Sequence, residues 1–275
     1  MTKAKWGMRL AWTVVSLSLM IATGARADGY ATEVNAPPVD EVRKFTYSFN
    51  LAFVSDYVFR GISQTDNDPA MQGGIDIGYG ILYAGWWASQ LDFEGFGNDA
   101  KVEMDWYVGM RPTWGPLTFD FAALYYTYPG AGWIPPLVGP QPAYMEFKAG
   151  VSGSPVKDLI LGATLYYSPD NFFETGPAFT GEGSAAYTFH AVGPFTPTVS
   201  ALIGYQDSED ASYLTFNGFD NYWYWNAGLA LVVDKLTFDF RYWDTTASNP
   251  VSDNLACINN YCDERFVFSA KVLLP

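Results

Sequence analysis

This chain of 275 residues has little of the chemistry on which most enzymes depend. It contains one histidine and two cysteines, only 16% of its residues are charged, and 29 acidic residues outnumber 15 basic ones. No cluster of histidine and cysteine has the spacing of a transition-metal site. The acidic balance disfavours nucleic acid and anionic head groups as partners. We therefore predict no metal, no cofactor and no nucleic-acid partner.

Long apolar runs are also scarce. The only candidate, Leu10 to Ala22, follows Lys3, Lys5 and Arg9 and precedes an A-x-A site at residues 25–27. This layout predicts a secretory signal peptide over residues 1–27, with a retained helical anchor as the alternative. Its removal would leave 11 basic and 29 acidic residues, a net charge of −18. No later window approaches 18 apolar residues, so the sequence predicts no membrane-spanning helix.

Aromatic residues, by contrast, make up 18% of the chain. From Phe45 to Arg60 the odd positions are aromatic or aliphatic, apart from Ser55, and the even positions are small or polar. Successive side chains of a strand point to opposite faces, so this stretch predicts a strand with one apolar and one polar face. It is about twice the usual strand length, and a tilted strand needs roughly nine to eleven residues to cross a bilayer. We interpret it as a strand of a transmembrane barrel.

Turn-rich breaks divide the remaining sequence, and short and long breaks alternate. The short breaks lie near 80–81, 114–116, 153–157, 192–194 and 234–235. The long breaks cover 61–70, 93–100, 129–142, 168–180, 207–220 and 247–262. These eleven connections predict 12 strands, with short turns on one rim and long loops on the other, as in outer-membrane barrels. A soluble secreted β-sandwich, the alternative, gives no reason for loop lengths to alternate.

The predicted fold is thus all-β, a transmembrane antiparallel up-and-down β-barrel of about 12 strands, preceded by a cleaved signal peptide. The barrel covers residues 45–275, and residues 28–44 form a flexible periplasmic lead-in. We expect the protein in the outer membrane of a Gram-negative bacterium, in contact with its lipid, with both termini periplasmic. The sequence leaves the oligomeric state open.

Charged residues of the predicted strands fall almost entirely on the face opposite the apolar one, which we expect to line the lumen. The predicted lumen-lining residues are Asp56, Arg60, Asp76, Asp92, Lys101, Glu103, Asp105, Arg111, Asp120, Glu146, Lys148, Glu182, Asp239, Arg241, Arg265 and Lys271. Two interpretations fit them: ion pairs that partly fill the bore, or an electrostatic constriction that screens solutes. Twelve strands lie between small filled barrels and wide channels, so the sequence does not choose.

Two pairs of tyrosines mark strand ends before long loops. Tyr125 and Tyr167 belong to the apolar face, where they predict an outer aromatic girdle. Tyr126 and Tyr166 belong to the inner face, where they either line a path or fill the bore.

The long loops and the single histidine offer few candidate sites. Cys257 and Cys262 predict a loop-closing disulfide in an oxidising compartment, with a redox role as the lesser alternative. The acidic segment 207–210 has the composition of a calcium loop and equally that of a solvated loop. His190 is expected beside a short turn, on the wrong rim for a barrel lipase or protease near the outer leaflet. We therefore predict that the protein is not an enzyme.

The first strands also carry a family resemblance. The segments concerned are NLAFVSDYVFRGISQT (50–65), PAMQGGID (69–76), YAGWWAS (83–89) and EMD (103–105). Over about residues 45–110 they resemble the TorF-type putative porins, proteobacterial outer-membrane proteins of unknown function; beyond that, only the strand pattern is shared. The resemblance implies an outer-membrane barrel and passive passage of solutes, and it implies no particular substrate.

The SDYVFRG motif places Asp56 and Arg60 four residues apart on the predicted inner face. With Asp76 and Asp92 they predict an ion-pair cluster near the extracellular mouth, serving either anchoring or solute selection. For the whole chain, we expect a porin-like channel for passive diffusion of small solutes or ions. The alternative is a plugged barrel that acts as a structural or surface-binding protein through its acidic long loops.

Overall fold

The computed structural model describes residues 45–94, 98–132, 139, 141–208, 221–247, 257 and 260–275. The predicted signal peptide (1–27) and lead-in (28–44) lie outside the described residues, and so do Glu209 and Asp210 of the suggested calcium loop. Among the described residues, no helix is both long enough and apolar enough to cross a membrane.

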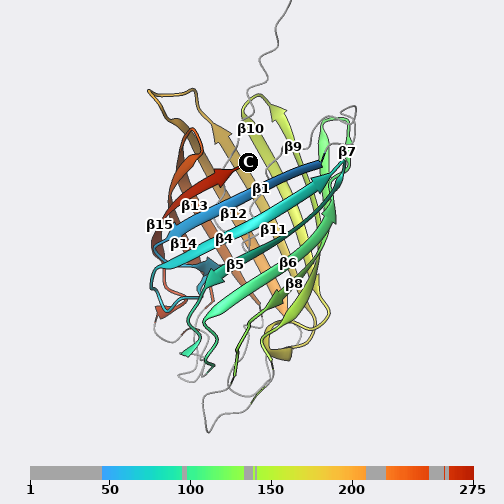
Figure 1. The fold of residues 1–275 in the computed structure, drawn as a ribbon, viewed down its shortest axis with the longest axis vertical. Helices are drawn as coiled ribbons and strands as arrows, with labels where there is room; N and C mark the ends of the chain where they lie inside the picture. The colour runs from blue at the N-terminus through green and yellow to red at the C-terminus, as the bar shows by residue number, and fades with distance from the viewer. Residues whose placement is uncertain are drawn as a thin grey trace, which may run out of the picture.

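Twelve antiparallel strands close into a single barrel (Figure 1). Around the ring they are β1 (Phe45–Val54), β4 (Ala70–Tyr79), β5 (Leu82–Gln90), β6 (Val102–Met110), β8 (Leu117–Thr127), β9 (Tyr144–Val156), β10 (Leu159–Ser168), β11 (Ala178–Thr188), β12 (Thr196–Ser208), β13 (Asn221–Val233), β14 (Leu236–Thr245) and β15 (Arg265–Leu274). Pairing of β15 with β1, with Phe53 opposite Ala270, closes the ring. The predicted barrel of about 12 strands is confirmed.

Short turns and long loops lie at opposite ends of the barrel (Figure 1). The short-turn rim also holds the start of β1 and the end of β15. The predicted break at 153–157 is corrected: β9 continues to Val156, and the turn consists of Lys157 and Asp158. Three smaller elements complete the described fold: β7 (Thr113–Trp114), a 3₁₀ turn η2 (Phe172–Glu174), and a separate two-stranded sheet of β2 (Val58–Phe59) and β3 (Ile62–Ser63).

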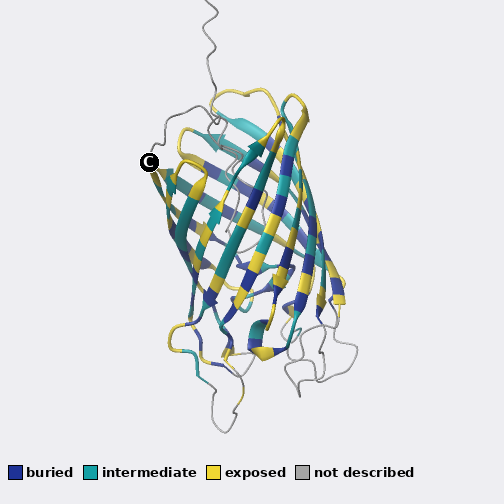
Figure 2. Cartoon of the chain, turned by 90° about the vertical axis from the view of Figure 1, so that its right-hand side faces the viewer, coloured by how far each residue is buried: buried dark blue, intermediate teal, exposed yellow. Residues whose placement is uncertain are grey.

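The outer face of the barrel is apolar. Exposed and buried residues alternate along the strands (Figure 2). The exposed set is made of large side chains such as Leu51, Phe121, Leu165, Ile203 and Phe240. This pattern is inverted relative to a soluble sheet and is the one that a lipid-facing surface requires.

Charge is nearly absent from that outer face. Among charged residues of the described strands only Asp207 and Asp244 lie on it, opposite the exposed Phe179 and Trp225. Each stands one residue from the long-loop end of its strand. A charge at the middle of a bilayer costs about 2–4 kcal/mol and near the interface only about 0–1 kcal/mol, which accounts for this placement.

Aromatic side chains mark both edges of the apolar face. At the long-loop edge, Tyr167 contacts Phe179 and Tyr205 contacts Trp223, with ring centroids 4.7 and 4.8 Å apart. At the short-turn edge the exposed rings are Phe45, Tyr47, Tyr79, Trp114, Tyr187 and Phe189. Tyrosine and tryptophan favour the membrane–water interface, so these two belts delimit the lipid-facing band.

Phe240→Arg tests this assignment. Phe240 stands mid-strand on β14, 52% exposed and packed on Phe268. In liposomes, we expect the free energy of unfolding of Phe240→Arg to be about 2–4 kcal/mol lower than that of Phe240→Ala. Trp114→Arg, at the short-turn rim, is the depth control and should cost about 0–1 kcal/mol. Equal costs at both positions would contradict a lipid-facing band.

Candidate functional site

The chain between β1 and β4 turns into the lumen. The predicted strand from Phe45 to Gly61 is too long: β1 ends at Val54, and residues 55–63, called here the lumen hairpin, fold inward. Tyr57, predicted on the outer face, is only 1% exposed. The period of two assigns a face only while the chain stays extended, so after Val54 residues of both predicted faces, such as Tyr57 and Arg60, are buried inside the barrel.

A two-residue turn at Arg60 and Gly61 makes the tip of this hairpin. Their φ angles are 47° and 83°, the left-handed values that two-residue hairpin turns require. On either side Val58 pairs with Ser63 and Phe59 with Ile62. The sequence pattern concealed this turn because aromatic and polar residues continue to alternate through it.

The lumen hairpin contacts strands on several sides of the barrel. Next to its base, the Tyr57 ring packs on Trp87 of β5 at 5.5 Å, and its hydroxyl donates to Glu103 of β6 at 3.1 Å. At its tip, a Cβ added to Gly61 would lie 3.0 Å from Tyr224 of β13 and 2.8 Å from Thr245 of β14. The hairpin therefore reaches from one wall to the opposite one.

Arg60 anchors the tip of the hairpin. Its guanidinium forms two hydrogen bonds with the carboxylate of Glu146 on β9, at 2.8 and 3.0 Å, and donates to Gln206 of β12 at 3.3 Å. It also lies 5.0 Å from the ring of Tyr166 on β10. Burial alone lowers the pKa of Arg60, but the Glu146 carboxylate together with Tyr224 and Tyr144 outweighs it and holds that pKa well above its ordinary value. The hairpin tip thus carries a permanent positive charge.

Asp56 and Arg265 tie the base of the hairpin to the barrel. Asp56 accepts hydrogen bonds from Ser63 at 2.7 Å and Thr65 at 2.9 Å, and Arg265 of β15 pairs with it at 2.7 Å. Tyr261, next to Cys262 of the Cys257–Cys262 disulfide, also contacts this region, because its backbone carbonyl accepts a hydrogen bond from the Ser63 amide at 2.9 Å.

The structure replaces the predicted cluster of Asp56, Arg60, Asp76 and Asp92 with separate interactions. The hairpin turn sends Asp56 to the base and Arg60 to the tip, where their ion pairs are with Arg265 and Glu146. Asp76 lies on β4 opposite Ser48 and accepts a 2.5 Å bond from Tyr107. Asp92, in the loop after β5, pairs with Lys101 at 2.9 Å. A spacing of four on one face brings side chains together only where the backbone is regular.

The remaining predicted residues lie on the inner wall or beside it. Asp120 is the centre of one group, with Lys148 at 2.9 Å, Arg111 at 3.3 Å and the Tyr83 hydroxyl at 2.6 Å. Asp239 and Arg241 pair at 2.9 Å on β14, and Lys271 of β15 is also buried. Lys101 departs from the inner-wall prediction, because it precedes β6 and its side chain is 48% exposed.

Three buried carboxylates form no ion pair among the described residues: Glu103, Asp105 and Glu182, which are 3%, 4% and 8% exposed. Glu103 accepts from the Tyr57 hydroxyl, and Glu182 accepts from the Tyr224 hydroxyl at 2.5 Å. One oxygen of Asp105 and one of Glu182 are buried without a hydrogen-bond partner in the described part of the chain. The long-loop half of the lumen is therefore richer in acid than in base.

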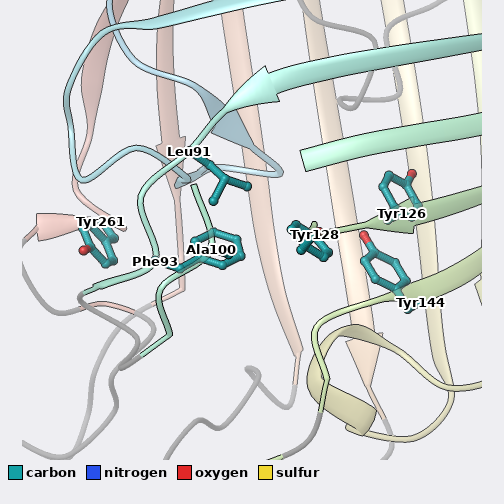
Figure 3. Packing of buried hydrophobic residues seen from close by; sticks show 7 residues of the cluster. All are labelled: Leu91, Phe93, Ala100, Tyr126, Tyr128, Tyr144 and Tyr261. Carbon is teal, nitrogen blue, oxygen red and sulfur yellow. The ribbon is translucent and has the colours of Figure 1, made fainter. Parts of the chain in front are cut away.

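Aromatic side chains surround the hairpin on the same half of the barrel. Figure 3 shows seven residues of this cluster, which are Leu91, Phe93, Ala100, Tyr126, Tyr128, Tyr144 and Tyr261. Tyr126 and Tyr144 stack with centroids 4.4 Å apart, and the Tyr126 hydroxyl donates to Glu146 at 3.0 Å. The sequence predicts that Tyr126 and Tyr166 either line a solute path or fill the bore. In the structure both side chains are buried.

The other candidate sites of the sequence stay apart from this region. His190 is exposed just after β11, next to the 192–195 turn. Within the described residues, no group of three or more histidine, cysteine, aspartate or glutamate side chains could hold a metal ion. The lumen around the hairpin is the candidate site.

Comparison with known proteins gives a family and a fold. A family model described as "Bacterial protein of unknown function (Gcw_chp)" matches residues 40–272. The description does not mention TorF, so that part of the resemblance stays a prediction. No curated protein matches the chain.

Two solved structures with a similar fold are a KdgM porin, and a KdgM porin in complex with disordered oligogalacturonate. Their TM-scores are 0.53 and 0.51. Each is 7% identical in sequence to this chain, and each match covers 83% of this chain and 98% of the matched porin chain. At this identity the likeness shows a shared fold of the outer-membrane barrel type.

Glu146→Gln tests whether Arg60 holds the lumen hairpin in place. Removing one partner of a buried ion pair costs about 3–5 kcal/mol, and withdrawal of the hairpin would relieve that cost. We expect faster hydrogen exchange at backbone amides of residues 55–63 in detergent-folded protein, with strand amides unchanged. Asp239→Asn, which breaks another buried pair away from the hairpin, is the matched control. Unchanged exchange in Glu146→Gln would contradict an anchoring role.

Proposed function

The chain belongs to the Gcw_chp family of bacterial proteins of unknown function, and we propose that it is an outer-membrane channel through which small solutes or ions diffuse passively. We further propose that the bacterium is Gram-negative and that the short-turn rim, with both termini, faces the periplasm. The solute path is the barrel lumen, and the predicted lumen-lining residues act along it. No catalytic step is part of this function.

The observation that carries the proposal is the opposite polarity of the two faces. The outer face is apolar along the strands, while Asp120, Lys148, Asp239 and Arg241 lie on the inner one. Lipid requires the first arrangement, whereas hydrated solutes require the second. A barrel built only as an anchor has no need for charged groups along its inner wall, since apolar side chains would fill it at lower cost.

The lumen hairpin supports a second candidate function, a plugged barrel whose acidic long loops bind partners at the cell surface. Its residues touch β5, β6, β9, β12, β13 and β14, so solutes would have to pass beside it or displace it. In the channel hypothesis the hairpin is a movable constriction, and in the plug hypothesis it is a permanent closure. Conductance separates the two.

Gly61→Val is the variant that distinguishes them. Gly61 has a φ of +83°, and an added Cβ would collide with Thr245 and Tyr224, so valine should push the tip off the opposite wall. A left-handed non-glycine residue costs roughly 1–2 kcal/mol, which corresponds to about a tenfold increase in open probability. Gly80→Val, with a φ of +60° and no atom near the added Cβ, is the control for backbone strain alone.

Single-channel currents in planar bilayers are the measurement, on protein whose folding is checked by heat-modifiable gel mobility. We expect discrete openings in the wild type and in Gly80→Val, and more frequent or larger openings in Gly61→Val. Folded protein that stays silent in all three forms would overturn the channel and leave the plugged barrel.

A further inference from the structure

The surroundings of Arg60 have the composition of a site for an organic cation. A carboxylate contacts the guanidinium through two parallel hydrogen bonds, and the rings of Tyr166 and Phe59 lie 5.0 and 4.8 Å from it. Paired carboxylate contact and aromatic faces are the two ways in which proteins bind guanidinium and ammonium groups. Here the bound group is a side chain of the protein itself.

This region also holds more acidic side chains than Arg60 can pair with. Asp105 interacts electrostatically with Glu103 and Glu146, and Glu182 interacts with Arg60 and Glu146. Lys148, the other cation acting on Glu182, is already paired with Asp120 at 2.9 Å. The Arg60 guanidinium therefore interacts with two acidic side chains, Glu146 and Glu182, while Asp105 lies beside Glu146 and Glu103 beside Asp105.

Two of these acidic side chains also have a carboxylate oxygen that lacks a hydrogen-bond donor. Asp105 and Glu182 are each more than nine-tenths buried, and each has one oxygen with no hydrogen-bond partner among the described residues. A buried carboxylate oxygen without a donor is costly, and a ligand carrying several N–H groups would satisfy it. The surplus of acidic side chains and the oxygens without a donor both favour a ligand that combines a positive charge with N–H groups.

Arg60 stands on a different part of the backbone from the acidic side chains around it. Glu103, Asp105, Glu146 and Glu182 stand on barrel strands, whereas Arg60 stands at the turn of a hairpin whose two strands have two residues each. The wall can therefore keep its shape while the hairpin leaves. A free cation that reaches the wall would compete with Arg60 for Glu146.

We propose that the carboxylates and tyrosines around Arg60 form a binding site for small organic cations that carry guanidinium or ammonium groups, and that Arg60 occupies this site as a tethered substitute for the solute. The inference rests on the proposed function, for which it names the solute class. Binding of the solute displaces Arg60 and loosens the lumen hairpin. The site favours cations and rejects acidic solutes.

The test uses Nα-acetyl-L-argininamide as the probe and Nα-acetyl-L-citrullinamide, its neutral analogue, as the control probe, on protein folded in detergent; the two are called argininamide and citrullinamide below. Titration calorimetry should show argininamide binding and no citrullinamide binding. Arg60→Ala removes the competitor and should strengthen argininamide binding about tenfold. Adding Glu182→Gln to Arg60→Ala should weaken it again, while adding Asp239→Asn, a carboxylate already paired with Arg241, should not.

A second readout needs no variant. In the wild type, saturating argininamide should accelerate hydrogen exchange at residues 55–63, and citrullinamide should not. Equal binding of the two probes, or unchanged affinity in a folded Arg60→Ala protein, would overturn the site. Binding is measured here without conduction: a silent barrel that binds argininamide would refute only the channel, and a conducting barrel that does not bind it would refute only the site.

Discussion

A strand in hydrocarbon has no water to satisfy its backbone groups, and this constraint underlies the whole structure. Every backbone N–H and C=O in the membrane must find a partner on a neighbouring strand, so the sheet has to close. Pairing of β1 with β15 provides the closure and joins the two ends of a 12-strand ring. Closure gives each strand a lipid side and a lumen side, and the period of two then assigns every side chain to one of them.

Closure also creates an interior in which charges are confined. On the short-turn side of the lumen, charges are neutralised within the wall, as in the group around Asp120 and the pair of Asp239 and Arg241. On the long-loop side the wall carries surplus carboxylates, and the main compensating charge enters on the lumen hairpin as Arg60. Wall and hairpin are thus complementary: the wall supplies the acid and aromatic rings, and the hairpin supplies the cation.

This complementarity connects the two functions that fit the barrel. A hairpin held only by apolar packing would be a passive plug. In this hairpin the tip is held by one guanidinium in an acid-rich region, and in the proposed site a solute of the same chemistry takes the place of that guanidinium. Other attachments of the hairpin lie at its base: the ion pair of Asp56 with Arg265, the contact of Ser63 with Tyr261, and the contacts of Tyr57 with Trp87 and Glu103. They would keep the hairpin at the mouth when its tip moves.

The sequence by itself determined the barrel. Alternation along segments such as Leu117–Thr127 and Leu236–Thr245, with alternating loop lengths, predicted 12 strands, because both signals arise from local geometry. Only the tertiary structure decided what fills the lumen. Residues 55–63 keep the alternation of a strand, yet the chain leaves the wall after Val54 and reverses at Arg60 and Gly61, which brings Arg60 to Glu146, 86 positions later in the chain. Such a contact depends on how far the hairpin reaches across a closed ring, and a pattern of period two records only which face a residue occupies.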